Sequence, residues 1–234
     1  NWNFPIAFSK HDSSKLYTYS NHVHLSTDEG HSWETISPDL TRNDKSKLVS
    51  SGGPITQDNT GVEYYATIFA VDESPLQEGL IWVGSDDGLI HLTKDGGATW
   101  ENVTPKKMPD WMMINSIDAS SFDSGTAYIA GTRYKLGDFT PYLYVTDDYG
   151  KNWKLITDGI KDEHFTRVLR SDKVNKNILY AGTETGMYIS YDRGNSWNEF
   201  QKNLPIVPIT DLTIKDNSLI CLLYTSDAAD ELTS

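Results

Sequence analysis

The chain has 234 residues and no apolar run near the roughly 18 residues that a membrane-spanning helix needs, so a membrane span is not expected. Aromatic residues make up 12% of the chain and the apolar runs are strongly patterned, which excludes general disorder. The net charge of −13 repels phosphate backbones and argues against nucleic acid as a partner. One cysteine excludes a disulfide framework.

Short runs of β-branched and aromatic residues follow one another from the first residues onward, separated by turn residues. The chain opens at Asn1 without a basic and then apolar leader, and we interpret it as an internal piece of a longer protein. Each unit has an opening run, a second run, a third run and a closing segment. In chain order these are 5–8, 16–19, 22–25 and 34–36; 67–71, 80–83, 89–92 and 101–103; 116–119, 127–130, 142–145 and 154–156; 167–169, 178–181, 187–189 and 198–200; and an opening run at 211–214.

One octet, [Ser/Thr]-x-Asp-x-Gly-x-x-Trp, stands between the third run and the closing segment of every complete unit. We expect a structural role for it, because the Asp can accept N–H bonds within its own turn, the Gly allows a left-handed backbone and the Trp packs between sheets. No calcium-loop ligand array follows any octet. Its recurring residues are Asp28, Gly30 and Trp33; Asp95, Gly97 and Trp100; Asp148, Gly150 and Trp153; and Asp192, Gly194 and Trp197.

Four strands in about 44 residues are typical of a β-propeller blade. We predict an all-β propeller fragment with blades at 2–43, 64–108, 112–160 and 164–204, and with residues 207–220 opening a fifth. Such an open arc leaves two sheet edges exposed and should self-associate, and the remaining blades of a parent chain are its expected partners.

The octets resemble Asp-boxes, also called BNR repeats, which occur in sialidases, xyloglucan-cleaving glycoside hydrolases, sortilin-type ectodomains and photosystem assembly factors. The linking segments resemble a bacterial family of large Asp-box propellers that carry the labels sortilin-like or glycosyl hydrolase. The resemblance covers about residues 1–220 and implies export to the periplasm or the cell exterior. It implies much less about activity, because one fold hosts many functions. The linking segments are 36–44, 51–55, 131–137, 182–186 and 207–212.

The last part of the chain resembles the translation of a sequencing adapter. The eleven residues 221–231 match that translation in order, and they include Cys221, the only cysteine. We therefore predict that residues 221–234 are a non-native tail, although the apolar run 219–224 is also able to form a strand.

Propeller connectivity places the loops that enter the first strand, and those that join the second strand to the third, on the face opposite the octets. Propellers usually hold ligands on that face, and aromatic rings with a few polar groups suit a carbohydrate or a peptide. Alternatively, these rings pack the loops onto one another. The residues expected there are Tyr64, Tyr65, Trp111 and His164, with Trp2, Phe4, Met112, Met113 and Phe165, the long loop 133–140 and the insertion 37–63.

Charged residues in the opening strands are further candidates. Arg167 and Asp211 would come from adjacent blades and form either an ion pair or a polar clamp for a ligand. Asp118 lies inside a predicted inner strand, so it should be hydrogen-bonded or have a raised pKa, and Asp118 and Asp211 are weak acid–base candidates. The six histidines have no metal-ligand spacing, and no cofactor motif appears, so neither a metal nor a cofactor is expected.

Two functions remain open from the sequence. We favour a noncatalytic propeller that binds a glycan, protein or peptide. The alternative is an inverting, xyloglucanase-like glycoside hydrolase, which needs two carboxylates roughly 6.5–9.5 Å apart that the spacing does not identify. A sialidase is disfavoured, because it needs an arginine cluster and only five arginines are present, of which Arg193 lies inside an octet.

Overall fold

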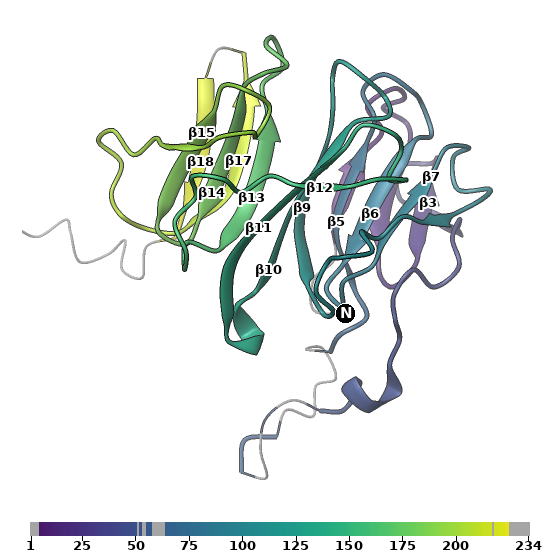
Figure 1. Cartoon of the computed structure of the whole chain (residues 1–234). Helices are drawn as coiled ribbons and strands as arrows, with labels where there is room; N and C mark the ends of the chain where they lie inside the picture. The colour runs from purple at the N-terminus through teal and green to yellow at the C-terminus, as the bar shows by residue number, and fades with distance from the viewer. Residues whose placement is uncertain (1–4, 51, 53–54, 58–63, 217, 225–234) are drawn as a thin grey trace, which may run out of the picture.

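The computed structural model of the chain describes residues 5–50, 52, 55–57, 64–216 and 218–224. Four four-stranded antiparallel sheets and one two-stranded sheet follow one another along the chain and form an arc that does not close (Figure 1). The predicted propeller fragment, with four blades and the start of a fifth, is confirmed. No helix in the described residues is long and apolar enough to cross a membrane.

Each sheet is called a blade here and takes its strands in sequence order from the centre of the arc outward. Blade 1 has β1 (Ile6–Phe8), β2 (Leu16–Tyr19), β3 (Val23–Ser26) and β4 (Glu34–Thr35), followed by the 3₁₀ turn η1 (Lys45–Lys47); blade 2 has β5 (Ile68–Glu73), β6 (Ile81–Ser85), β7 (Ile90–Thr93) and β8 (Glu101–Asn102); blade 3 has β9 (Met113–Ala119), β10 (Ala127–Arg133), η2 (Tyr134–Leu136), β11 (Asp138–Thr146) and β12 (Lys154–Leu155); blade 4 has β13 (Thr166–Ser171), β14 (Leu179–Thr183), β15 (Gly186–Ser190) and β16 (Asn198–Glu199); and blade 5 has β17 (Ile209–Lys215) and β18 (Ser218–Leu223).

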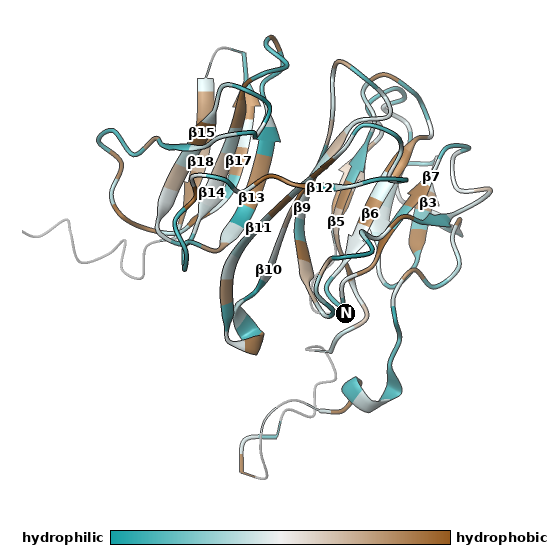
Figure 2. Ribbon diagram, in the orientation of Figure 1, coloured by the Kyte–Doolittle hydropathy of each residue, from teal (hydrophilic) through white to brown (hydrophobic). Residues whose placement is uncertain are grey.

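Apolar side chains on both faces of the middle strands build a separate core at every junction between blades. Figure 2 shows that apolar residues concentrate on the strands, while the turns at their ends are mostly hydrophilic. In β6, Ile81 and Val83 pack toward blade 1, whereas Trp82 packs toward blade 3. This alternation follows from the two-residue period of a strand. It explains why the blades depend on their neighbours for burial.

The four octets form the turn between the third and fourth strands, as the spacing predicts, and their hydrogen bonds repeat. In the second octet, Asp95 accepts bonds from the Thr93 hydroxyl and from the backbone N–H and hydroxyl of Thr99, while the Gly97 N–H donates to Thr93 Oγ1. These bonds lower the pKa of Asp95 to about 2, and the bond from the Thr99 hydroxyl contributes most. The same set recurs around Asp28, Asp148 and Asp192.

Blade 3 differs from the prediction between its second and third strands. We predicted a long loop over 133–140, but β10 continues to Arg133 and β11 begins at Asp138, so only η2 and Gly137 form the turn. The prediction was wrong because Arg133 and Asp138 face each other in register and form an ion pair of 2.6 Å. Gly137 closes the turn with φ of 75°, a left-handed conformation that glycine adopts readily.

The end of the chain forms a strand as far as it is described. Cys221 pairs with Leu212 in the β17–β18 hairpin. The adapter origin of residues 221–231 concerns where the sequence comes from and stays a prediction. Residues 225–234 lie outside the described part of the chain.

Candidate ligand site

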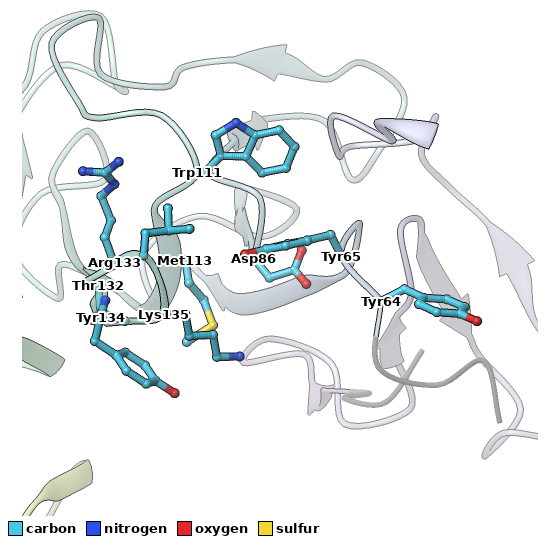
Figure 3. A pocket seen from close by; sticks show the side chains of 10 residues that line it. Tyr64, Tyr65, Asp86, Trp111, Met113, Thr132, Arg133, Tyr134 and Lys135 are labelled. Carbon is cyan, nitrogen blue, oxygen red and sulfur yellow. Dashed lines mark hydrogen bonds between the residues drawn. The ribbon is translucent and has the colours of Figure 1, made fainter. Parts of the chain in front are cut away.

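A cavity of about 250 Å³ opens between blades 2 and 3 on the face opposite the octet turns, where the connectivity predicts a ligand site. The segments that enter β5 and β9 supply one part of its lining, and the β6–β7 and β10–β11 turns supply the other part. Three of the six predicted ligand-binding residues meet here. The lining consists of Tyr64, Tyr65, Asp86, Trp111, Met113, Thr132, Arg133, Tyr134, Lys135 and Leu136 (Figure 3).

Aromatic rings form one wall of the cavity. Tyr65 and Trp111 make an edge-to-face contact with their ring centroids 5.4 Å apart. The Arg42 guanidinium lies 5.4 Å from the Trp111 ring centroid and the Lys47 ammonium 5.9 Å from it, which are cation–π distances. Figure 3 shows the Trp111 indole above Tyr65 and Asp86, whose side chains overlap in this view.

The backbone beside these rings adopts conformations that side chains rarely tolerate. Trp111 has φ of 60° and Ala66, next to Tyr65, has φ of 72°. A non-glycine residue in this region costs on the order of 1 kcal/mol, and such residues cluster at functional sites. The same conformation also occurs at Glu29, Tyr149 and Arg193 inside the octet turns, so it does not by itself distinguish this wall.

Asp86 is the one acidic residue among the described residues of the cavity lining. Its side chain follows β6, is only 5% exposed, and accepts the Thr67 backbone N–H at 2.9 Å. Burial, reinforced by the neighbouring Asp87 carboxylate, raises the pKa of Asp86 to about 7. Near neutral pH, Asp86 is therefore able to donate as well as accept a hydrogen bond or a proton.

Asp87 is not among the lining residues and has structural partners. Its carboxylate accepts the Ser85 hydroxyl at 2.6 Å and the Arg42 backbone N–H at 2.8 Å. The following Gly88 has φ of 91°, and a Cβ there would lie 2.9 Å from the Met112 nitrogen. The turn needs glycine at this position in order to pack against the segment that carries Trp111.

Arg167 supports the far wall of the cavity without lining it. Its guanidinium lies 5.1 Å from the ring centroids of both Tyr134 and Phe165, and these two rings stack 5.2 Å apart. The same guanidinium forms a 2.6 Å ion pair with Glu184. Arg167 thus fixes η2 of blade 3 against blade 4.

The structure does not form the Arg167–Asp211 pair that we considered. Asp211 instead pairs with Arg170 at 2.9 Å, while Arg167 pairs with Glu184 in the β14–β15 turn. Sequence spacing alone did not distinguish Arg167 from Arg170, and a β-bulge between Thr166 and Val168 shifts the register there. Asp211 lies outside the cavity lining, and its side chain is 56% exposed.

Two other predicted residues lie away from the cavity. His164 shares a 2.8 Å hydrogen bond with the Tyr188 hydroxyl within blade 4. Asp118 is buried and hydrogen-bonded, accepting the Ser171 backbone N–H at 2.9 Å and contacting Lys173 at 3.4 Å. These bonds join blades 3 and 4 and account for the burial of Asp118 without a ligand. Trp2 and Phe4 lie outside the described residues.

Asp86 is the residue that the sequence reasoning missed. The sequence does contain a pattern that indicates it. Two adjacent acidic residues and a glycine follow the apolar second strand of blade 2, in a turn on the predicted ligand face. In the described part of the chain, no group of three His, Cys, Asp or Glu residues is arranged to hold a metal ion.

Comparisons with solved structures show the same fold in larger proteins. An ancestral GH74 enzyme superimposes with a TM-score of 0.61 at 19% identity, over 84% of this chain and 23% of that one. The GH74 xyloglucanase from Xanthomonas campestris gives 0.59 at 17% identity, over 83% and 29%. The Cps50 (Swd1) β-propeller domain from Myceliophteria thermophila gives 0.64 at 10% identity, over 93% and 61%. The chain thus spans about a quarter of the two GH74 enzymes, and these identities show the fold alone.

Among curated protein sequences, none matches this chain. The family model described as "Sortilin, neurotensin receptor 3" matches residues 141–231, which include blade 4, its octet and the predicted adapter segment. The octet turns, the stacked blades and this match confirm the predicted resemblance: the chain is a β-propeller segment with Asp-box repeats, and its residues 141–231 are similar to the sortilin family.

Proposed function

We propose that this propeller segment is a noncatalytic binding module that takes a carbohydrate or a peptide into the cavity between blades 2 and 3. The observation that carries the proposal is that Tyr64, Tyr65 and Trp111 line one cavity together with Asp86, the one buried carboxyl among the described lining residues. Flat rings supply apolar contact area at low entropic cost, and one buried polar group fixes orientation.

The presence of one carboxyl group among the described lining residues favours binding over hydrolysis. An inverting glycosidase needs a second carboxylate roughly 6.5–9.5 Å from the first. Among the lining residues that the structure describes, Asp86 is the only acidic one, and the adjacent Asp87 is held by Ser85 and Arg42. The described lining residues therefore supply a surface for binding a carbohydrate or a peptide, and only one of the two carboxyl groups that an inverting glycosidase needs.

The binding test compares two aromatic variants of the full chain. Ligands are first identified on glycan and peptide arrays, and their affinities are then measured by calorimetry. Trp111→Ala should weaken binding at least about tenfold, because a central aromatic anchor contributes more than about 1 kcal/mol. Tyr191→Ala is the matched control, since Tyr191 is 60% exposed within the fourth octet, away from the cavity. Equal affinities for both variants would rule out this cavity as the site.

Asp86 gives specific support to a second candidate, glycoside hydrolysis. A carboxyl with a pKa of about 7 suits a general acid at neutral pH. The two GH74 structures show that this fold accommodates such enzymes. If this candidate is correct, the chain releases reducing sugar from xyloglucan and Asp86→Asn slows release at least about a hundredfold while glycan affinity persists. Binding without any release supports the noncatalytic module.

A further inference from the structure

The glycine and tryptophan of each octet hold one residue of the preceding blade at three successive junctions. Trp100 donates its indole N–H to the Ile36 carbonyl at 2.9 Å, Trp153 donates to Val103 at 2.7 Å, and Trp197 donates to Ile156 at 2.7 Å. Each acceptor is an Ile or Val that lies three positions after the tryptophan of its own octet. The octets thus join neighbouring blades through one repeated contact.

The octet glycine provides the space for that Ile or Val. A Cβ added at Gly150 would lie 2.6 Å from Val103 Cβ, and one added at Gly194 would lie 2.6 Å from Ile156 Cδ1. Real Cβ atoms do not approach so closely, so a side chain at the octet glycine would displace the residue of the preceding blade.

Within the described residues, the octet of blade 1 has no such contact with another blade. Trp33 donates its indole N–H to Gly30 of its own octet at 3.1 Å, and its side chain is 44% exposed, whereas Trp197 is 4% exposed. The nearest neighbours of an added Cβ at Gly30 would be Trp33 and Leu16, both from blade 1.

The face that carries Trp33 exposes apolar side chains of β1 beside the polar residues Thr18, His24 and Ser26. The β1–β2 register pairs Ile6 with Thr18 and Phe8 with Leu16, which places these side chains on one side of the sheet. Ile6 and Phe8 are 68% and 66% exposed, while Ala7 packs on the opposite side toward blade 2. The positions that correspond to Leu16 in blades 2, 3 and 4 are completely buried; they are Ile81, Ala127 and Leu179.

We propose that this face is a docking surface for one further Asp-box blade, which places an Ile or Val on Gly30 and offers that residue's carbonyl to Trp33 Nε1. The inserted residue is the one three positions after the tryptophan of the incoming octet, as at the three occupied junctions. Blade 4 of a second copy does not supply it, because the corresponding residue is Phe200, which packs in the core that blade 4 shares with blade 5.

The test adds a copy of residues 112–163 ahead of Asn1 in the full chain, so that Ile156 of the added copy can reach Gly30. Both proteins are labelled with 5-fluorotryptophan, and Trp33→Phe assigns the Trp33 resonance. The readout is the change of the fluorine shift between H₂O and D₂O, which reports exposure to solvent. In the fusion, the Trp33 resonance should lose this isotope shift and resemble that of Trp197.

Three controls keep the result decisive. Ile156→Asp in the added copy should leave Trp33 exposed, and burial of Trp33 in that variant would overturn the proposed residue preference. A second fusion, which adds residues 64–111 and offers Val103, repeats the test if the first fusion fails to fold. The proposal is overturned if Trp33 stays exposed in a fusion whose Trp197 resonance is the same as in the unfused chain. Burial of Trp33 when the unfused chain is concentrated overturns it too, by identifying a second copy as the occupant.

Discussion

At the scale of single residues, the Asp86 carboxyl links the stability of the fold to pH. It is held at a pKa of about 7 by burial, whereas the same group in an unfolded chain titrates near about 3.9. Between these two pH values the folded protein keeps a proton that the unfolded chain releases. The free energy of unfolding contributed by this group therefore falls as the pH rises from about 4 to about 7.

Asp86→Asn should remove this decrease of the unfolding free energy with pH, because the amide keeps the acceptor for Thr67 N–H and carries no charge. The difference in unfolding free energy between variant and wild type should grow by a few kcal/mol between about pH 4 and pH 7. Urea denaturation of both proteins at several pH values measures it. The octet carboxylates do not interfere, since the pKa values of Asp28 and Asp95 are about 2 and their stabilisation is lost at lower pH. Parallel pH profiles would contradict the buried, protonated carboxyl.

Arg167 acts at the same scale as a positioning residue. Its guanidinium contacts the Tyr134 and Phe165 rings while pairing with Glu184, so Arg167→Ala should loosen η2. Arg167→Lys keeps the charge but not the planar stacking group, and should restore little. We expect faster hydrogen exchange in residues 133–138 and a weaker ligand affinity for both variants. Unchanged exchange there would show that η2 does not depend on Arg167.

At the scale of elements, the octets allow a direct comparison of two equivalent tryptophans. Trp197→Ala removes a side chain buried between blades 3 and 4 and should cost about 3–5 kcal/mol. Trp33→Ala removes a half-exposed side chain that bonds within its own turn and should cost less than about 1 kcal/mol. Chemical denaturation of the two variants in parallel measures the difference. Equal losses would show that the octet stabilises its own turn rather than the junction.

The strands and octet turns were predictable from sequence because their signals are local. Alternating apolar residues define each strand, and the Asp and Gly of an octet form bonds within eight residues. The turn at 134–136 was not predictable in the same way, because the pairing of Arg133 with Asp138 decides where β10 ends.

The candidate site was predictable only to the extent that chain connectivity determines it. Connectivity placed Tyr64, Tyr65 and Trp111 on one face, but it did not identify their cavity or include Asp86. The partners of Arg167 and Asp211 depend on a bulge and on side-chain direction, which a linear pattern does not contain. Burial, which raises the pKa of Asp86, likewise depends on the folded structure and not on the linear pattern.

At the scale of the whole molecule, two series of contacts join successive blades. Near the centre, an inner-strand carboxylate accepts an N–H of the next blade: Asp72 accepts from Ala119 and Asp118 accepts from Ser171. Near the rim, each octet tryptophan donates to the preceding blade. Because every contact joins only neighbours, the stability of the arc is a sum over its junctions.

The outer face of blade 1 lies at one end of this series and leads to the last prediction. Ile6, Phe8 and Trp33 expose apolar surface on it, and such a patch in a chain of net charge −13 still favours association. We expect the sedimentation coefficient to rise with protein concentration and the thermal transition to shift with it, while the Trp33 indole stays exposed because a second copy offers Phe200 in place of an Ile or Val. Phe8→Lys should reduce both dependences, because a charge on that face opposes burial. Val174→Lys is the matched control, since Val174 is 83% exposed in the β13–β14 turn. A concentration-independent monomer with a sharp transition would show that this exposed face does not drive association.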